Sequence, residues 1–250
     1  MAAVVLVPGF WLGAWVWADV ARELRASGHE VYPVTLTGVG ERAGEATPEV
    51  GVRTHIADLA RVIEDNDLRE VLLVAHSGAT VPVTGVAERL PGRIGRLVYL
   101  DSAPLPSGVS VLGANSPRVR EEWARQVAER GEGRLLPPPS FERTDGAAEL
   151  AGLTDEHLAR LRELATPEPY AAATGSLELP DGLPPVPRSL ICCTSTPEQV
   201  REWADSGHPL FAPLAGMEVW HLPTGHWPMI SRPRELAALL AALSHRMPPG

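Results

Sequence analysis

Short apolar runs alternate with longer amphipathic stretches along most of this chain, and this alternation restricts its fold more than any other feature. Runs such as Val4–Val7, Val71–Val74 and Leu97–Leu100 have the length of buried strands, and stretches between them carry apolar residues close to helical spacing. Strands that alternate with helices along a chain form a parallel sheet with crossover helices. The sequence therefore predicts an α/β fold with a mostly parallel sheet flanked by helices.

The alternation stops between residues 105 and 188. This segment contains the proline-rich stretches LLPPPS and LPDGLPPVP and two stretches of helical spacing. A segment of this length without a strand is uncommon in a compact domain unless it is an insertion. We expect a single domain over residues 1–250, with a core of residues 1–104 and 189–250. Residues 105–188 are expected to form a helical cap, inserted after the strand that ends near Leu100.

The composition limits the partners of the chain. Its formal net charge of −9 argues against nucleic acid and anionic membrane surfaces. No apolar run approaches the roughly 18 residues of a membrane span, and the start MAAVVLVPGF lacks the pattern of a signal peptide. The two cysteines, Cys192 and Cys193, are adjacent, which suits neither a disulfide framework nor a metal site. We expect a cytoplasmic protein that acts on a small molecule without metal or cofactor, either as a monomer or as a homodimer.

A serine follows the third predicted strand in the segment VLLVAHSGAT, residues 71–80. The C-terminal end of a parallel strand lies at the face where open α/β sheets bind ligands. Ala75 and Ala79 fit a sharp strand-to-helix turn that exposes the Ser77 hydroxyl, with alanines in place of the glycines of G-x-S-x-G. The motif alone also suits an unreactive polar turn residue.

Further motifs place this serine in a known context. VLVPGF, LTGVGER, AHSGA, LVYLDSAP and TGHWPMISRPRELAALL occur in the order found in α/β-hydrolases. Over nearly the whole chain except the cap, the sequence resembles the small esterase and hydroxynitrile-lyase branch that includes plant methylesterases. The resemblance implies the α/β-hydrolase fold, with Ser77 as the nucleophile and His226 as its base. It also implies an oxyanion hole formed by the backbone N–H groups of Phe10 and Gly78.

Other side chains are expected around this centre. Trp11, together with Phe10 and Trp15, is expected to line the acyl pocket, although such residues also fill cores. From the cap, Trp123 or Leu161 is expected to face the same pocket. Among the other histidines, His76 is expected to point away from Ser77 and His55 to be solvated.

The third member of the triad is absent from the position that the resemblance implies. Most relatives have an Asp just after the penultimate strand, in a pattern like C-T-x-D, whereas this chain has Thr196 there. Asp101 is the first candidate, because some lipases keep their acid at the end of the corresponding earlier strand. Glu198, two residues beyond the vacant position, is the fallback acid. The third possibility is a site without an acid.

The function predicted from these residues is hydrolysis of a carboxylic ester or lactone of a small to medium-sized molecule through an acyl-enzyme. The alternative is a repurposed α/β-hydrolase-fold enzyme of secondary metabolism that catalyses elimination, cyclisation or C–C lyase chemistry. The missing acid and the altered serine turn favour that alternative. A non-catalytic binding protein on the same fold is the third class, which the presence of Ser77 and His226 disfavours.

Overall fold

The computed structural model describes residues 2–143 and 148–246, and its centre is a six-stranded sheet in the order β2-β1-β3-β4-β7-β8. Each strand runs parallel to its neighbours. The strands are β1 (Ala3–Val7), β2 (Glu30–Pro33), β3 (Val71–His76), β4 (Ile94–Leu100), β7 (Arg188–Cys192) and β8 (Glu218–His221). The predicted α/β class with a mostly parallel sheet is confirmed.

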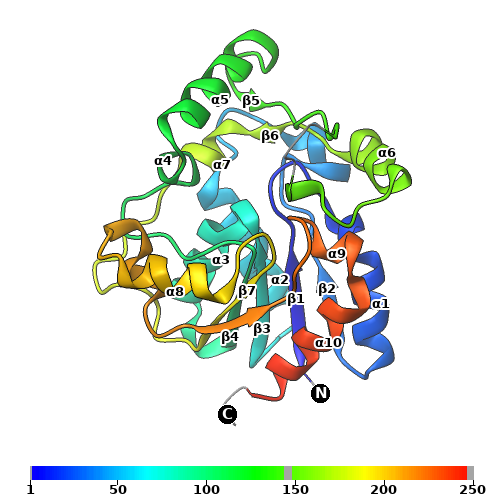
Figure 1. Cartoon of the computed structure of the whole chain (residues 1–250), viewed down its shortest axis with the longest axis vertical. Helices are drawn as coiled ribbons and strands as arrows, with labels where there is room; N and C mark the ends of the chain where they lie inside the picture. Colours follow the sequence, from blue (N-terminus) through cyan, green and yellow to red (C-terminus); the bar gives the residue numbers. More distant parts are fainter. Residues whose placement is uncertain (1, 144–147, 247–250) are drawn as a thin grey trace.

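Helices cover both faces of this sheet (Figure 1). Successive strand residues point to opposite faces, so Leu72 and Val74 of β3 pack with α1 and α10, whereas Leu73 and Ala75 pack with α2 and α3. The longer helices of the two layers are α1 (Ala18–Ala26), α2 (Val52–Asp65), α3 (Thr80–Arg89), α8 (Pro197–Asp205) and α10 (Pro233–Ser244). Shorter helical turns are η1 (Ala14–Trp17), η2 (Gly40–Glu45), η3 (Ser77–Ala79), η4 (Pro91–Arg93), η5 (Ala148–Leu150), η6 (Pro209–Leu214) and α9 (Pro228–Ser231). No helix in residues 2–143 and 148–246 is long and apolar enough to cross a membrane.

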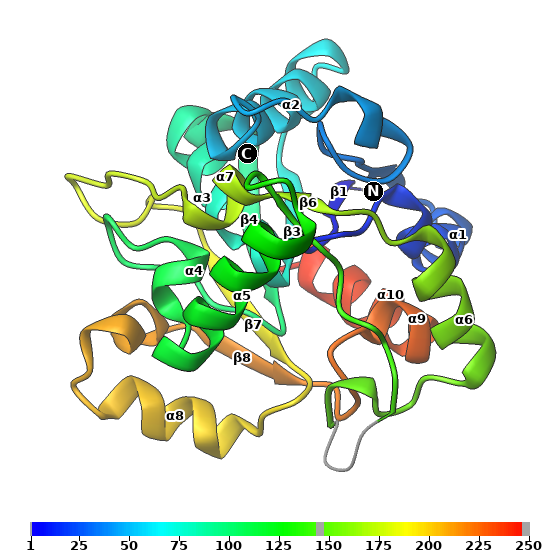
Figure 2. The same ribbon diagram turned by 90° about the horizontal axis from the view of Figure 1, so that it is seen from above.

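The described residues between β4 and β7 form a layer above the C-terminal ends of the strands (Figures 1 and 2). We refer to residues 105–187 as the cap, because Arg188, which was expected to end it, is the first residue of β7. Its elements are α4 (Val111–Ala114), α5 (Pro117–Arg130), β5 (Leu135–Leu136), α6 (Asp155–Leu164), β6 (Glu168–Pro169) and α7 (Tyr170–Thr174). None of its described residues joins the central sheet, but β5 and β6 pair antiparallel, with Leu136 opposite Glu168. This pair is a departure from the expected helices and loops, because strands of two residues are too short to show an alternating pattern.

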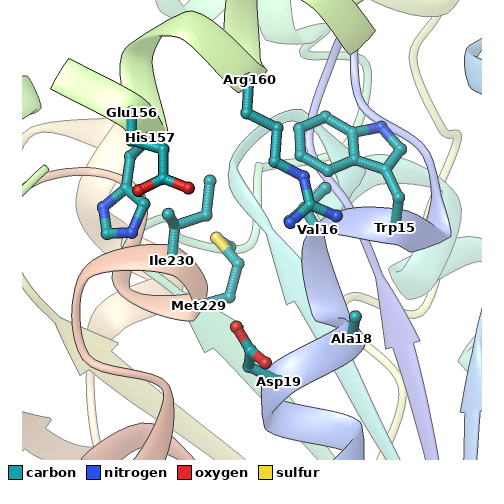
Figure 3. A pocket seen from close by; sticks show the side chains of 9 residues that line it. All are labelled: Trp15, Val16, Ala18, Asp19, Glu156, His157, Arg160, Met229 and Ile230. Atoms are coloured by element: carbon teal, nitrogen blue, oxygen red, sulfur yellow. The ribbon is translucent and has the colours of Figure 1, made fainter. Parts of the chain in front are cut away.

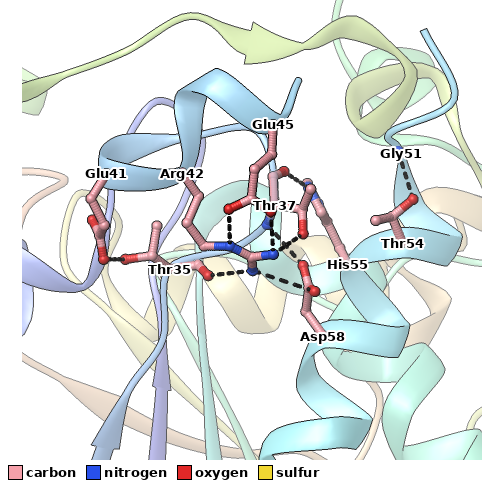
Figure 4. Close-up of polar contacts among 9 residues, drawn as sticks. All are labelled: Thr35, Thr37, Glu41, Arg42, Glu45, Gly51, Thr54, His55 and Asp58. Atoms are coloured by element: carbon pink, nitrogen blue, oxygen red, sulfur yellow. Dashed lines mark hydrogen bonds and ion pairs between the residues drawn. The ribbon is translucent and has the colours of Figure 1, made fainter. Parts of the chain in front are cut away.

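Polar side chains hold the loop that follows β2 (Figure 4). Arg42 donates hydrogen bonds to the Thr35 carbonyl at 3.2 Å and to the Thr37 hydroxyl at 2.5 Å. Its guanidinium also lies 3.4 Å from Asp58, which accepts the Thr37 N–H at 2.8 Å. His55 is buried, contrary to the expectation of a solvated residue, because its Nε2 points inward and donates to the Thr37 carbonyl at 3.0 Å. These hydrogen bonds fix the backbone of the loop, which lies below the cap.

Candidate active site

Ser77 lies in the sharp turn between β3 and α3, with a backbone φ of 50°. A positive φ is uncommon for a residue with a side chain and is found at functional turns. The turn is crowded, because a Cβ atom on Gly9 would lie 2.8 Å from the Ser77 Cβ and 2.9 Å from His76 Nδ1. Ala75 and Ala79 are both buried on either side of the serine. The small residues around Ser77 thus allow the loop after β1 to approach the serine closely.

A chain of two hydrogen bonds connects Ser77 with a histidine and an acid. His226, in the loop between β8 and α9, has its Nε2 atom 2.8 Å from the Ser77 Oγ. Its Nδ1 atom lies 2.6 Å from Asp101 Oδ2. If Nδ1–H donates to the carboxylate, Nε2 is free to accept the serine proton. The structure thus brings Ser77, His226 and Asp101 together in the order that nucleophilic catalysis requires.

Asp101 directly follows β4, again with a positive φ, of 46°. Its Oδ1 atom accepts the backbone N–H groups of Cys193 at 2.9 Å and Thr194 at 3.0 Å, and the Thr194 hydroxyl lies 3.1 Å away. Burial alone would raise the pKa of Asp101, but the hydrogen bond and charge of His226, with the two amides, outweigh burial and hold it at about 2. The carboxylate is therefore ionised at neutral pH although only 4% of its side chain is exposed.

The end of β7 contributes hydrogen-bond donors to the site. Sequence reasoning considered Cys193 and Thr194 only as part of a motif that lacks its acid, and it missed their hydrogen bonds to Asp101. The vacant position, Thr196, is the N-cap of α8 and accepts the Gln199 N–H at 3.3 Å. Glu198, the fallback acid, lies in the first turn of α8, where it is two-thirds exposed and pairs with Arg201 at 2.6 Å. The structure gives Glu198 no hydrogen bond to His226.

The residues expected to form the oxyanion hole lie in the two turns that meet at Ser77. A Cβ atom on Gly78 would lie 2.6 Å from the Phe10 ring, so these two residues are in contact. The amides on either side of Phe10 have partners: Gly9 N–H donates to His76 Nδ1 at 3.2 Å, and Trp11 N–H donates to Glu168 at 3.0 Å. Within the described residues, the Phe10 N–H has no hydrogen-bond partner. It is therefore available to a ligand.

His76 connects two loops of the site. Because its Nδ1 accepts the Gly9 N–H, its Nε2 carries the proton and donates to the His226 carbonyl at 2.7 Å. Burial, reinforced by the neighbouring His226, lowers the pKa of His76 to about 3, so the ring is neutral at physiological pH. The two rings lie 4.8 Å apart between centroids. His76 thus links the loop after β1 with the loop that carries His226, a role that sequence reasoning did not foresee.

Three of the five side chains expected around the pocket form an aromatic cluster. Phe10, Trp11 and Trp123 lie with ring centroids 6.0 to 6.2 Å apart, and Trp11 meets each of the other two rings edge to face or nearly so. Trp15 is elsewhere, in a separate hollow of about 250 Å³ between α1, α6 and α9, where Arg160 lies 5.5 Å from its ring centroid (Figure 3). Leu161 is fully buried in the hydrophobic core. Helix α6 therefore turns Leu161 toward the core packing and not toward Phe10 and Trp11.

No group of three or more His, Cys, Asp or Glu side chains is placed to hold a metal ion within residues 2–143 and 148–246. Cys192 and Cys193 are free and buried. Burial raises the pKa of the Cys192 thiol to about 11, so this thiol stays protonated at neutral pH.

Residues 4–239 match the family model of the alpha/beta hydrolase family, and the chain belongs to this family. A carbendazim hydrolyzing esterase from Nocardioides sp. (strain SG-4G) is 32% identical over 255 residues, which cover 97% of this chain and 100% of that protein. Methylesterase 7 of Arabidopsis thaliana is 25% identical, over 97% of this chain and 96% of that protein. The predicted relation to the small esterases of this family is confirmed.

A solved structure agrees with this fold. It is an extracellular alpha/beta-hydrolase from a Paenibacillus species, described as sharing structural and functional homology with tobacco salicylic acid binding protein 2. It superposes with a TM-score of 0.80 at 20% identity and covers 97% of this chain and 98% of its own. The predicted α/β-hydrolase fold is confirmed.

Proposed function

We propose that the protein is a serine esterase that hydrolyses carboxylic esters or lactones of small to medium-sized molecules. The observation that carries this proposal is the continuous hydrogen-bonded chain from Ser77 through His226 to Asp101. In this proposal Ser77 is the nucleophile, His226 the general base and Asp101 the acid that orients the histidine. The esterase relatives support the same class of reaction.

The proposed reaction has two halves. In the first, His226 Nε2 takes the hydroxyl proton while Ser77 Oγ attacks the carbonyl carbon of the ester. The negative charge that forms on the carbonyl oxygen is stabilised by the N–H groups of Phe10 and Gly78. The C–O bond to the alcohol then breaks, and the alcohol leaves with the proton from His226. In the second half His226 deprotonates a water molecule, which attacks the acyl-enzyme and releases the carboxylic acid and Ser77.

Asp101 has two functions in this reaction. Its carboxylate keeps the proton of the neutral ring on Nδ1, so that Nε2 can accept the serine proton. It also stabilises the imidazolium that forms when Nε2 is protonated. Both functions require an ionised carboxylate, which the pKa of about 2 provides over the whole neutral range.

The proposed substrate is an ester with an apolar acyl group. The rings of Phe10, Trp11 and Trp123 form an apolar cluster that includes the residue whose N–H is proposed for the oxyanion hole. Carbendazim, the compound in the name of the Nocardioides relative, and simple methyl esters are the first substrates to test. A p-nitrophenyl ester with a short acyl chain is the general probe.

The test combines a variant with a covalent label. Ser77→Ala is expected to abolish hydrolysis of the p-nitrophenyl ester while the melting temperature stays close to that of the wild type. An organophosphonate probe is expected to label Ser77 in the wild type, as located by mass spectrometry. Ser206→Ala, at an exposed serine outside the site, is the matched control and should behave like the wild type in both assays. A folded Ser77→Ala protein that keeps most of its activity would refute the assignment of the nucleophile.

The lyase alternative has less support than hydrolysis. Its main basis was the absence of an acid at Thr196, and the hydrogen bond between Asp101 and His226 removes that basis. A cytoplasmic location and a homodimer remain predictions of the sequence, and the Paenibacillus neighbour is described as extracellular. A folded, unlabelled wild type that cleaves no ester would return elimination, cyclisation or C–C lyase chemistry to first place.

A further inference from the structure

The hydrogen bonds between the cap and the loop after β1 converge on one residue, Trp11. Its backbone N–H donates to the carboxyl group of Glu168 at 3.0 Å, and its indole N–H donates to the Leu136 carbonyl at 3.1 Å. Its own carbonyl accepts the Thr166 N–H at 2.9 Å. Glu168 and Leu136 are the paired residues of β6 and β5, so the small antiparallel pair holds Trp11 from both of its strands.

Trp11 has a backbone conformation that needs such support. Its φ is 69°, in the left-handed region that bulky residues rarely adopt. Residues in this region keep their conformation only where the surroundings over-determine it. Trp11 follows Phe10 directly, so a relaxation at Trp11 would also move the Phe10 amide. The contacts of Trp11 with the cap therefore bear on the proposed oxyanion hole.

Glu168 is an unusual residue for the place it occupies. It is 2% exposed, and within the described residues its carboxyl group has one hydrogen-bond partner, the Trp11 N–H. Burial raises its pKa to about 8, so the group is largely a neutral acid at neutral pH. An apolar side chain would be buried at lower cost. Packing alone thus gives no reason for a carboxyl group here, whereas the Trp11 N–H does.

The position of Glu168 relative to the site is also informative. It lines a narrow void together with Gly9, Phe10 and Gly78, the residues around the proposed oxyanion hole. On the far side of Phe10, the Gly9 N–H is held by His76. The N–H groups of Gly9 and Trp11 are thus bound by His76 at the end of β3 and by Glu168 of the cap, and the Phe10 N–H between them stays free within the described residues.

We infer that Glu168 is a positioning residue for the oxyanion hole: by accepting the Trp11 N–H, it holds the loop after β1 so that the Phe10 N–H faces the substrate. This inference rests on the proposed function. A neutral acid suits the task, because it accepts the hydrogen bond without placing a full negative charge beside the oxyanion. The cap then completes the catalytic machinery in addition to covering it.

Three variants test this inference. Glu168→Leu removes the acceptor at similar size, and Glu168→Gln keeps a neutral acceptor oxygen in its place. Thr166→Val is the matched control: the Thr166 hydroxyl accepts the Gly40 N–H at 2.7 Å, so the change removes another bond between cap and core and keeps the backbone N–H of residue 166 that donates to the Trp11 carbonyl. Because loss of a whole oxyanion donor costs about 10²–10³-fold in kcat, loss of its positioning in Glu168→Leu is expected to cost about 10–100-fold with little change in KM. Glu168→Gln and Thr166→Val are expected to keep kcat within about 3-fold of the wild type.

A second measurement does not depend on turnover. The backbone amide of Trp11, followed by hydrogen exchange in NMR spectra, is expected to exchange faster in Glu168→Leu than in the other three proteins. An active wild type whose kcat is unchanged by Glu168→Leu, or lowered equally by Thr166→Val, would overturn the positioning role alone. A wild type that cleaves no ester would overturn the proposed function, and the oxyanion role of Glu168 would fall with it.

Discussion

Replacing Asp101 by Asn is the sharpest test of the proposed triad, because the structure determines how the new amide must sit. Two backbone N–H groups, from Cys193 and Thr194, point at Oδ1 and require an acceptor there. The amide oxygen of Asn therefore takes the Oδ1 position, and its NH₂ group takes the place of Oδ2 beside His226 Nδ1. The NH₂ group donates to Nδ1, so the ring proton moves to Nε2. In that tautomer His226 cannot accept the proton of Ser77.

The expected loss of rate in Asp101→Asn follows from the free-energy cost of turning the new side-chain amide the other way round. Turning the amide so that its oxygen faces His226 leaves the N–H groups of buried Cys193 and exposed Thr194 without this acceptor, and the buried group alone costs about 1–3 kcal/mol. The productive tautomer is then disfavoured by at least about 1–3 kcal/mol, which corresponds to a loss of roughly 5-fold to 150-fold in rate. The lost charge of the carboxylate, which no longer stabilises the imidazolium, moves the expected value toward 10⁴-fold, the order known for such changes in serine triads.

The assay is kcat for a short-chain p-nitrophenyl ester near pH 7.5, with melting temperatures to show that each variant is folded. Glu198→Gln is the control, since Glu198 is exposed and bound to Arg201, and its activity should stay within about 2-fold of the wild type. An Asp101→Asn enzyme within about 10-fold of the wild type would refute the tautomer argument. The reverse pattern, with Glu198→Gln crippled and Asp101→Asn active, would move the acid to Glu198.

Three further predictions concern pH and close packing. The pKa of Asp101 lies at about 2 in the folded protein and at 3.8 ordinarily, so its contribution of about 2 kcal/mol is present above pH 4 and lost as the pH falls toward 2; urea unfolding should show this loss in the wild type and not in Asp101→Asn. The pKa of Glu168 is raised from 4.5 to about 8, so the wild type should lose roughly 3–5 kcal/mol of stability as the pH rises through that interval. Glu168→Gln should remove that loss, and a parallel decline of stability in both proteins would refute the prediction. The other titratable group that lines the same void is His55; burial lowers its pKa, so its titration changes stability in the opposite direction. Gly78→Ala should lower kcat about 10-fold or more, because the added Cβ would lie 2.6 Å from the Phe10 ring, whereas Gly44→Ala, with open space around it, should leave kcat unchanged.

The sheet and the serine turn could be predicted from sequence because both depend on local signals. The apolar run of β3 leads directly into Ala75, Ser77 and Ala79, so the strand, the turn and the start of α3 are all encoded within about ten residues. The β5–β6 pair gives no such signal. Its strands have two residues each and lie more than thirty positions apart in the sequence. Their pairing is seen only in the folded structure, where both strands bind Trp11.

The choice between the two acids depends on relations that no local pattern contains. Asp101 and Glu198 both follow apolar strands, and both are compatible with turn or cap positions. What separates them is the direction of the side chain: Asp101 turns inward at a positive φ, whereas Glu198, the second residue of α8, is exposed and pairs with Arg201. Trp15 is a second case in which the local sequence does not determine where a side chain lies. It lies only four residues from Trp11, yet it packs against Arg160 in a different hollow.

The position proposed for the acid has a physical explanation in the sheet itself. Strands β4 and β7 are parallel neighbours, and the Asp101 N–H still donates to the Ile191 carbonyl at 2.8 Å, so both strands end at the same edge beside His226. A carboxylate that begins on β4 therefore reaches the ring nitrogen from almost the same side as one that begins on β7. An acid at the end of β4 in place of β7 requires only that the end of β7 supply hydrogen-bond donors for the second carboxylate oxygen. Cys193 and Thr194 supply these donors. His226 can occupy the same position with either acid, because it needs only one ionised carboxylate oxygen beside Nδ1, and either strand can provide it.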